Sequence, residues 1–230
     1  MAAVLFDFSG TLFRIESAES WLRAVLAETE LSLDEPTFLQ KAQALERVGA
    51  LPGGTHPVEA VPDGLAHLWE SRDKSAELHR AAYTGVARQV PLPDPALYDA
   101  LYDRHMTPAA WSPYADAAEV LRALRERGIG VGVVSNIGWD LRPVFREHGL
   151  DSCVDAYVLS YEHGIQKPDP RLFATACAAL GVEPQDTLMV GDDRRADGGA
   201  AALGCGVHFV DHLPVTERPD GLRPVLDLVG

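Results

Sequence analysis

The sequence has little of three features that would each indicate a particular class of protein. It contains three cysteines, at positions 153, 177 and 205, and none of them forms a CxxC pair. This spacing predicts buried thiols in a reducing compartment and argues against a disulfide framework or a zinc site. No stretch approaches the roughly 18 to 20 uninterrupted apolar residues that a membrane span needs. Residues 1–6 carry no basic side chain and are followed by the charged Asp7, so we expect no signal peptide and a cytoplasmic protein.

Positive charge is also scarce. The chain has 20 Lys and Arg residues against 34 Asp and Glu residues, for a formal net charge of −14. Such a balance disfavours nucleic acid as a partner, because a phosphate backbone requires a basic face. An anionic substrate would need a local cation, either a metal ion or a few basic side chains. Lysine occurs only at positions 41, 74 and 167, which makes the position of each lysine informative.

The remainder of the composition, 47% hydrophobic and 23% charged, is typical of a globular protein. Short apolar runs at 3–7, 130–135, 156–160, 187–191 and 206–210 predict buried strands. Helical patterns lie between them at 114–127, 141–148, 171–180 and 195–203. Strands that alternate with amphipathic helices predict an α/β fold, a doubly wound parallel sheet of five strands with helices on both faces. We place the strand that ends at Asp7 in the centre.

Residues 14–110 follow a different pattern, with apolar positions three and four apart and no strand-like run. Helices are expected at 18–31, 64–72, 76–88 and 95–105, and another after a capping box at 32–35. Joints rich in proline and glycine lie at 51–57 and 90–95. We therefore expect a helical domain, 14–110, inserted into a core domain of 1–13 and 111–230. The hinges would lie near 13–16 and 106–113.

Four short polar segments follow predicted strands, at the edge where parallel sheets place their sites. They contain Asp7, Ser9 and Thr11; Ser135 and Asn136; Lys167; and Asp192, Asp193 and Asp197. A carboxylate at a strand end can attack a phosphoryl group and divide hydrolysis into two easier steps. Several carboxylates near Asp7 would repel one another unless a cation lay among them, and Mg²⁺ suits such an all-oxygen site. Taken singly, Asp7 could be a turn residue and the acidic segment a solvated loop.

In this order, the four segments resemble the motifs of the haloacid dehalogenase superfamily, and the insertion resembles the helical cap of that superfamily. The resemblance implies a hydrolase with Asp7 as covalent nucleophile and Mg²⁺ as cofactor. It also implies that Asp7, Asp192 and the main-chain carbonyl of Ser9 bind the metal, supported by Asp193 and Asp197. Phosphoryl oxygens would be bound by Thr11, Ser135 and Asn136, and Lys167 would add positive charge.

Position 9 departs from the pattern of the superfamily's phosphatases, which usually have Asp there as general acid and base. A serine hydroxyl is a poor proton acceptor near neutral pH, and losing a positioned acid or base typically costs about 10² to 10⁴ in rate. The segment also resembles the Asp-x-Thr-Gly-Thr motif of P-type ion pumps, whose aspartyl phosphate persists. Three interpretations stay open: a slow phosphatase of a small phosphorylated metabolite, a metal-independent 2-haloacid dehalogenase, or a weakly catalytic binding or regulatory protein. The chain could be a monomer or a homodimer.

A few further residues suit either a site or a structural role. Arg14, Arg194 and Arg195 could approach the substrate, although surface ion pairs are the more common role for such arginines. Histidine could replace the missing acid, but the histidines show no ligand spacing; the residues in question are His56, His105 and His163. Tryptophans 21, 69 and 111 are expected to pack in helices or hinges, although a tryptophan in the cap would suit an apolar leaving group.

Overall fold

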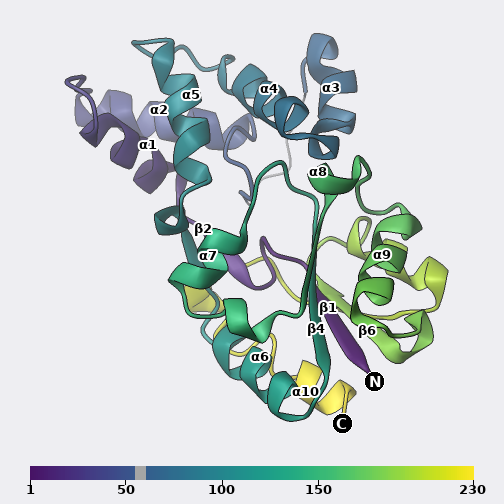
Figure 1. Cartoon of the computed structure of the whole chain (residues 1–230). Coiled ribbons are helices and arrows are strands. Elements are labelled where there is room, and N and C mark those ends of the chain that lie inside the picture. Colours follow the sequence, from purple (N-terminus) through teal and green to yellow (C-terminus); the bar gives the residue numbers. More distant parts are fainter. Residues whose placement is uncertain (55–60) are drawn as a thin grey trace.

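The computed structural model describes residues 1–54 and 61–230, and its central element is a parallel sheet (Figure 1). The strands are β1 (Ala3–Phe6), β4 (Gly130–Ser135), β5 (Ala156–Leu159), β6 (Thr187–Gly191) and β7 (Gly206–Phe209), in the spatial order β5-β4-β1-β6-β7. Every neighbouring pair is parallel. The predicted five-stranded sheet with the Asp7 strand at its centre is confirmed.

Helices cover both faces of this sheet. They are α6 (Ala117–Glu126), α7 (Arg142–Glu147), α8 (Ser160–His163), α9 (Pro170–Leu180) and α10 (Val225–Leu228). Successive strand residues face opposite sides, so Val4 and Phe6 pack in one apolar cluster with Val120 of α6. Leu5 packs in the other cluster with Phe173 of α9. Figure 1 shows α6 and α9 on opposite sides of the strands, as a doubly wound fold requires.

A helical segment separates the first strand from β4. It contains α1 (Ala18–Ala27), α2 (Glu35–Arg47), α3 (Ala66–Glu70), α4 (Ala76–Ala87) and α5 (Ala96–His105). Trp21 of α1 is buried, and its Nε1 donates a hydrogen bond to the carbonyl of Leu101 in α5 at 2.8 Å. The part of the predicted joint at 55–57, with His56, lies outside the described residues. The expected helices are present elsewhere in this segment.

The chain passes between the core and this helical segment twice, and each of these two crossings forms a short strand that periodicity did not predict. Strands β2 (Phe13–Ile15) and β3 (Trp111–Pro113) pair in antiparallel fashion. Each has three residues, too few to show a period. The expectation of no strand within 14–110 was therefore wrong at residues 14 and 15, which belong to β2. Arg104 reinforces the crossing with hydrogen bonds of 2.7 and 3.1 Å to the two carboxylate oxygens of Glu16.

Two helix starts also differ from expectation. Ser32 does not cap α2; Asp34 does, and its carboxylate accepts a hydrogen bond from the Thr37 N–H at 2.9 Å. A cap at Ser32 would put Pro36 where the first helical N–H is required, whereas the Asp34 cap puts it in the first turn. The second difference lies at 197–203, where a 3-10 helix replaces the α-helix expected at 195–203.

The turn between α3 and α4 is fastened to the core. Ser160 Oγ donates to the carbonyl of Asp73 at 2.5 Å, and Gln166 Nε2 donates to the carbonyl of Glu70 at 3.0 Å. His79 packs on the backbone of Gly138, where an added Cβ would lie 2.2 Å from the histidine Cβ. The helical segment is therefore held to the core on the side away from the β2–β3 crossing. Among the described residues, no helix has the length and apolar character needed to cross a membrane.

His105 is buried in the helical segment and is neutral there. Its Nδ1 donates to the carbonyl of Tyr102, while its Nε2 is buried without a hydrogen-bond partner among the described residues. Burial lowers the pKa of His105 to about 3. A proton on Nε2 would have no acceptor, so the folded chain excludes the charged form.

This burial predicts acid sensitivity. Between about pH 6.5, the ordinary histidine pKa, and pH 3, the unfolded chain binds a proton at position 105 that the folded chain does not. The free energy of unfolding should therefore fall as pH decreases, by up to about 1.4 kcal/mol per pH unit from this residue. Urea unfolding of His105→Asn between pH 7 and 5 should show a shallower pH dependence than the wild type. The exposed His163 provides the control, and an unchanged slope in His105→Asn would contradict the assignment.

Candidate active site

Asp7 follows β1 and begins a tight turn. The N–H of Gly10 donates to the carbonyl of Phe13 at 2.8 Å, and Gly10 has a φ of 79°, which favours glycine. An added Cβ at Gly10 would lie 2.6 Å from the Asp192 carboxylate and from His212. The glycine therefore lets the turn after Asp7 approach the acidic segment that follows β6.

Lys167 provides the local cation that the acidic composition requires. Its Nζ donates to Asp7 Oδ1 at 2.7 Å and to Asp197 Oδ1 at 2.6 Å, with 2% of its side chain exposed. Burial by itself lowers the pKa of Lys167, but the two carboxylates raise it above its ordinary value, so the amine stays protonated. Burial raises the pKa of Asp7 well above its ordinary value, and the charge of Lys167 offsets only part of that rise. The ammonium therefore favours the ionised form of Asp7.

Asn136 holds the main chain of Lys167. Its Nδ2 donates to the carbonyl of Lys167 at 3.0 Å, and its Oδ1 accepts from the N–H of Lys167 at 2.6 Å. Both ends of the amide are thus engaged, and Asn136 orients the lysine. Ser135, the last residue of β4, is buried beside it.

Asp197 is fixed by the turn after β6. Its Oδ2 accepts from the N–H of Asp193 at 3.0 Å, while its Oδ1 faces Lys167. A Cβ on Gly191 would lie 2.1 Å from Asp197 Oδ2, so the absence of a side chain there gives the carboxylate its place. The turn and the glycine together present Asp197 to the amine.

Three carboxylates meet at this edge of the sheet. Asp7, Asp192 and Asp197 each offer an oxygen, and the three oxygens lie within 4.8 Å of one another. Against the single charge of Lys167, three ionised carboxylates leave two negative charges, a costly arrangement without a further cation. An all-oxygen donor set of this kind suits Mg²⁺, so the residues present fit such an ion.

Two residues of the C-terminal segment that sequence reasoning missed, His212 and Arg218, support this group. His212 Nδ1 donates to Asp192 Oδ2 at 2.7 Å, and Thr11 Oγ1 donates to the other oxygen at 3.4 Å. Burial raises the pKa of Asp192, but its interaction with His212 and the charge of Lys167 together outweigh that effect and lower it. Arg218, 5% exposed, donates through Nη1 to the carbonyl of Gly10 at 2.6 Å and through Nη2 to the carbonyl of Thr11.

Ser9 lies against the helical segment. Its Oγ is 3.5 Å from the carbonyl of Gly53, to which Arg14 Nη1 donates at 2.8 Å. Gly53 has a φ of 76°, and an added Cβ there would lie 2.5 Å from Ser9 Oγ. Arg14, one of the arginines considered for substrate contact, thus fastens a loop of the helical segment beside position 9.

Other predicted candidates lie apart from the three carboxylates. Asp193 is exposed, and its Oδ1 accepts from the N–H groups of Arg195 and Ala196 at 2.8 and 2.9 Å. Arg194 stacks over the ring of Phe209 at 4.9 Å. His163 is exposed at the end of α8, and His105 is enclosed as described above. The structure therefore brings no histidine of the original three to Asp7 among the described residues.

A cavity of about 950 Å³ opens between the core and the helical segment. Its core side includes Asn136, Lys167 and Arg195, and its helical side includes Trp69 and Arg72. Of the three tryptophans considered, Trp21 and Trp111 are buried in packing, whereas Trp69 reaches the cavity. The position of Lys167 in the lining connects this space to the carboxylate group.

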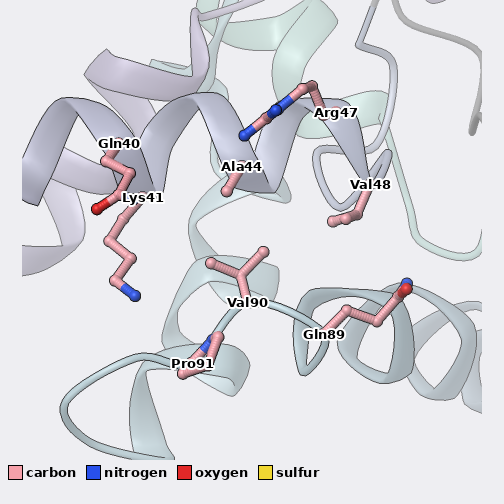
Figure 2. A pocket seen from close by; sticks show the side chains of 8 residues that line it. All are labelled: Gln40, Lys41, Ala44, Arg47, Val48, Gln89, Val90 and Pro91. Atoms are coloured by element: carbon pink, nitrogen blue, oxygen red, sulfur yellow. The ribbon is translucent and has the colours of Figure 1, made fainter.

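A second hollow, of about 500 Å³, lies wholly within the helical segment (Figure 2). Val90 points from the loop after α4 towards Ala44 on α2, and Lys41 extends from α2 towards Pro91. Its lining contains none of the polar residues predicted for the site. The larger cavity is therefore the candidate active site.

Comparisons with known proteins agree with this geometry. A model of the haloacid dehalogenase-like hydrolases matches residues 1–204. The chain is 31% identical over 209 residues to ribulose-1,5-bisphosphate 5-phosphatase of Halopiger xanaduensis, covering 88% of this chain and 81% of the relative. It is 32% identical over 161 residues to (S)-2-haloacid dehalogenase 4A of Burkholderia cepacia, covering 64% and 69%.

The fold has counterparts among solved structures. L-2-haloacid dehalogenase of Xanthobacter autotrophicus superposes with a TM-score of 0.64 at 21% identity, covering 100% of this chain and 84% of that one. At this identity the likeness concerns the fold alone. With a family model that spans most of its length, a parallel sheet of the same architecture and relatives of both chemistries, this chain belongs to the haloacid dehalogenase-like hydrolases.

Proposed function

We propose that this hydrolase is a Mg²⁺-dependent phosphatase of a small phosphorylated metabolite that forms an aspartyl phosphate at Asp7. The observation that carries the proposal is the meeting of Asp7, Asp192 and Asp197 beside one buried lysine, Lys167, which also lines a large cavity. A dehalogenase needs one nucleophilic carboxylate. Three carboxylates around one cation favour a reaction in which a metal and a phosphoryl group share the site.

In this mechanism Asp7 Oδ attacks phosphorus, and the leaving-group oxygen departs with the electrons of the broken P–O bond. Water then attacks the phosphorus of the aspartyl phosphate and regenerates the Asp7 carboxylate. Lys167 favours the ionised, nucleophilic form of Asp7 against the opposing effect of burial, and it offers positive charge to the phosphoryl oxygens. Asn136 keeps the lysine in place by its two hydrogen bonds to the main chain.

Asp7 and Asp192 would hold the metal ion, together with the main-chain carbonyl of Ser9. When bound, Mg²⁺ supplies positive charge that offsets the carboxylates and the phosphoryl group. We assign Asp197 a supporting role beside the metal, in which its Oδ1 binds Lys167 and its Oδ2 binds the N–H of Asp193. Asp193 would support the turn, since its carboxylate binds the N–H groups of that turn.

We further propose that residues 14–110 form a cap domain over a core of 1–13 and 111–230, with the crossings near 13–16 and 106–113 as hinges. Cap closure would exclude water from the phosphoryl-transfer step. The hydrogen bonds from Gln166 and Ser160 to the α3–α4 turn would have to break when the cap opens. In this proposal, the arrangement with these hydrogen bonds intact is the closed one.

A second candidate is a 2-haloacid dehalogenase, in which Asp7 displaces halide and forms an ester. The specific observation that favours it is Ser9, because ester formation with loss of halide needs no protonated leaving group. The similarity to (S)-2-haloacid dehalogenase 4A gives this chemistry a precedent among relatives. The fit of the carboxylates to Mg²⁺ supports the phosphatase instead.

The first test is phosphate release from p-nitrophenyl phosphate and acetyl phosphate, with Mg²⁺ and with a chelator. We expect release that requires Mg²⁺, because the three carboxylates would otherwise repel the dianionic substrate. Halide release from 2-chloropropionate is measured in parallel. Halide release without phosphate release would replace the proposal by the second candidate.

The nucleophile is tested by Asp7→Asn. Turnover of both phosphate esters should fall by at least about 10⁴-fold, because the amide cannot form the aspartyl phosphate. Circular dichroism should show the fold retained. The control is Asp140→Asn, which removes an exposed carboxylate that pairs with Arg142 on the surface. Substantial activity in Asp7→Asn would refute covalent catalysis at this residue.

The missing acid is tested by Ser9→Asp. Turnover of alkyl phosphates, whose leaving groups need a proton, should rise by about 10²-fold or more. Acetyl phosphate, with a better leaving group, should change far less. Ser9→Asn has a similar size without the acid and serves as the control. Equal rates in both variants would mean that another group supplies the proton.

A further inference from the structure

We infer that the cavity contains a second anion site, built on Arg72 in the helical segment. The inference rests on the proposed phosphatase function and specifies its substrate class: a phosphate ester whose leaving group carries a carboxylate or a second phosphate. The phosphoryl group would lie at Asp7 and Lys167, and the second anion would bind the Arg72 guanidinium on the opposite wall.

The Arg72 side chain is held in position before any ligand binds. Its Nη1 donates to the carbonyl of Trp69 at 2.7 Å, and its guanidinium lies 4.4 Å from the centroid of the Trp69 ring. The Trp69 ring in turn packs edge-on against Tyr83, with centroids 5.0 Å apart. All three side chains belong to residues that line the cavity. A fixed, stacked guanidinium loses little entropy when it binds an anion.

The charge of Arg72 is only loosely matched within the protein. The one ion pair found for it among the described residues joins Nη2 to Asp73 Oδ2 at 3.6 Å, beyond hydrogen-bond length. Burial raises the pKa of Asp73, which further disfavours its charged form. The Nε of Arg72 is buried without a partner in the described part of the chain. A guanidinium in this state favours an external carboxylate or phosphate.

The site is also fixed relative to the reaction centre. Arg72 lies between Glu70 and Asp73, whose carbonyls are bound by Gln166 and Ser160 of the core. The cavity is much larger than one phosphoryl group and suits a metabolite-sized leaving group. Glu70 and Asp193 also line it, and Asp193 Oδ1 accepts from two main-chain N–H groups. Arg72, Lys167 and Arg195 outnumber these two carboxylates in the lining, so the cavity can accept a second anion.

The test compares phosphate release from matched pairs of esters of equal length. The pairs are 2-phosphoglycolate with 2-hydroxyethyl phosphate, and 6-phosphogluconate with the open-chain glucitol 6-phosphate; in each pair one member has a carboxylate where the other has a hydroxymethyl group. For at least one pair, the wild type should favour the carboxylate member by about 10- to 100-fold in kcat/KM, the range of a charge-assisted hydrogen bond. In Arg72→Gln that ratio should fall to about 1.

Charge reversal gives a sharper readout. Arg72→Glu should favour phosphoethanolamine over 2-phosphoglycolate, whereas Arg72→Lys should retain part of the wild-type preference. The control is Arg88→Gln, because Arg88 is an exposed arginine that stacks on Tyr98 away from the cavity lining. Its ratios should equal those of the wild type. The ratio of kcat/KM values within a pair can be compared between variants even if a substitution changes the absolute rates. If Arg72→Gln does not fold, Arg72→Lys provides the comparison with the wild type.

Failure of the second anion site and failure of the proposed phosphatase function would give different results. If the wild type hydrolyses p-nitrophenyl phosphate but shows no preference within any pair, or keeps its preference in Arg72→Gln, the second anion site is refuted and the phosphatase stands. If the wild type releases no phosphate from any ester, the proposed function itself fails.

Discussion

The buried ammonium of Lys167 is the interaction on which the rest of the site depends. Without it, the carboxylates of Asp7 and Asp197 would face each other in a space from which water is largely excluded. Removing one partner of such a buried pair typically costs about 3–5 kcal/mol. The surrounding structure serves this ammonium: Asn136 fixes the lysine main chain, and the turn after β6 fixes Asp197. The ion pairs of Lys167 therefore both set the positions of Asp7 and Asp197 and stabilise this part of the fold.

Ser9 gives the site its particular chemistry. The hydroxyl contacts a carbonyl of the helical segment at Gly53, and Arg14 binds the same carbonyl. Where the phosphatases of the superfamily usually have an acid, this chain has a packing contact between core and insertion. We interpret this as a change of role, in which position 9 helps to seat the insertion and proton transfer is left weak. Leaving groups that depart without a proton fit this arrangement.

The helical segment does more than cover the site. Its α3–α4 turn is bound to the core through main-chain carbonyls, and the same turn carries Arg72 into the cavity. Main-chain contacts leave the side chains of the turn free to meet a ligand. In the proposed function, the insertion is fixed in place and still presents the Arg72 side chain to the leaving group, apart from the chemistry at Asp7.

The sequence by itself determined the sheet, because short apolar runs of four to six residues between amphipathic helices pack as parallel strands covered on both faces. The polar motifs follow the ends of these strands, where parallel sheets place their sites. It also singled out Asp7, Lys167, Asp192 and Asp197, which the fold brings together. Only the tertiary structure decided the rest. The β2–β3 crossing is too short to show a period. His212 and Arg218 reach the site from a segment without a motif, and Arg218 is 208 residues from Gly10 along the chain. Contacts of that kind depend on where folding places a residue, and local sequence carries no signal for them.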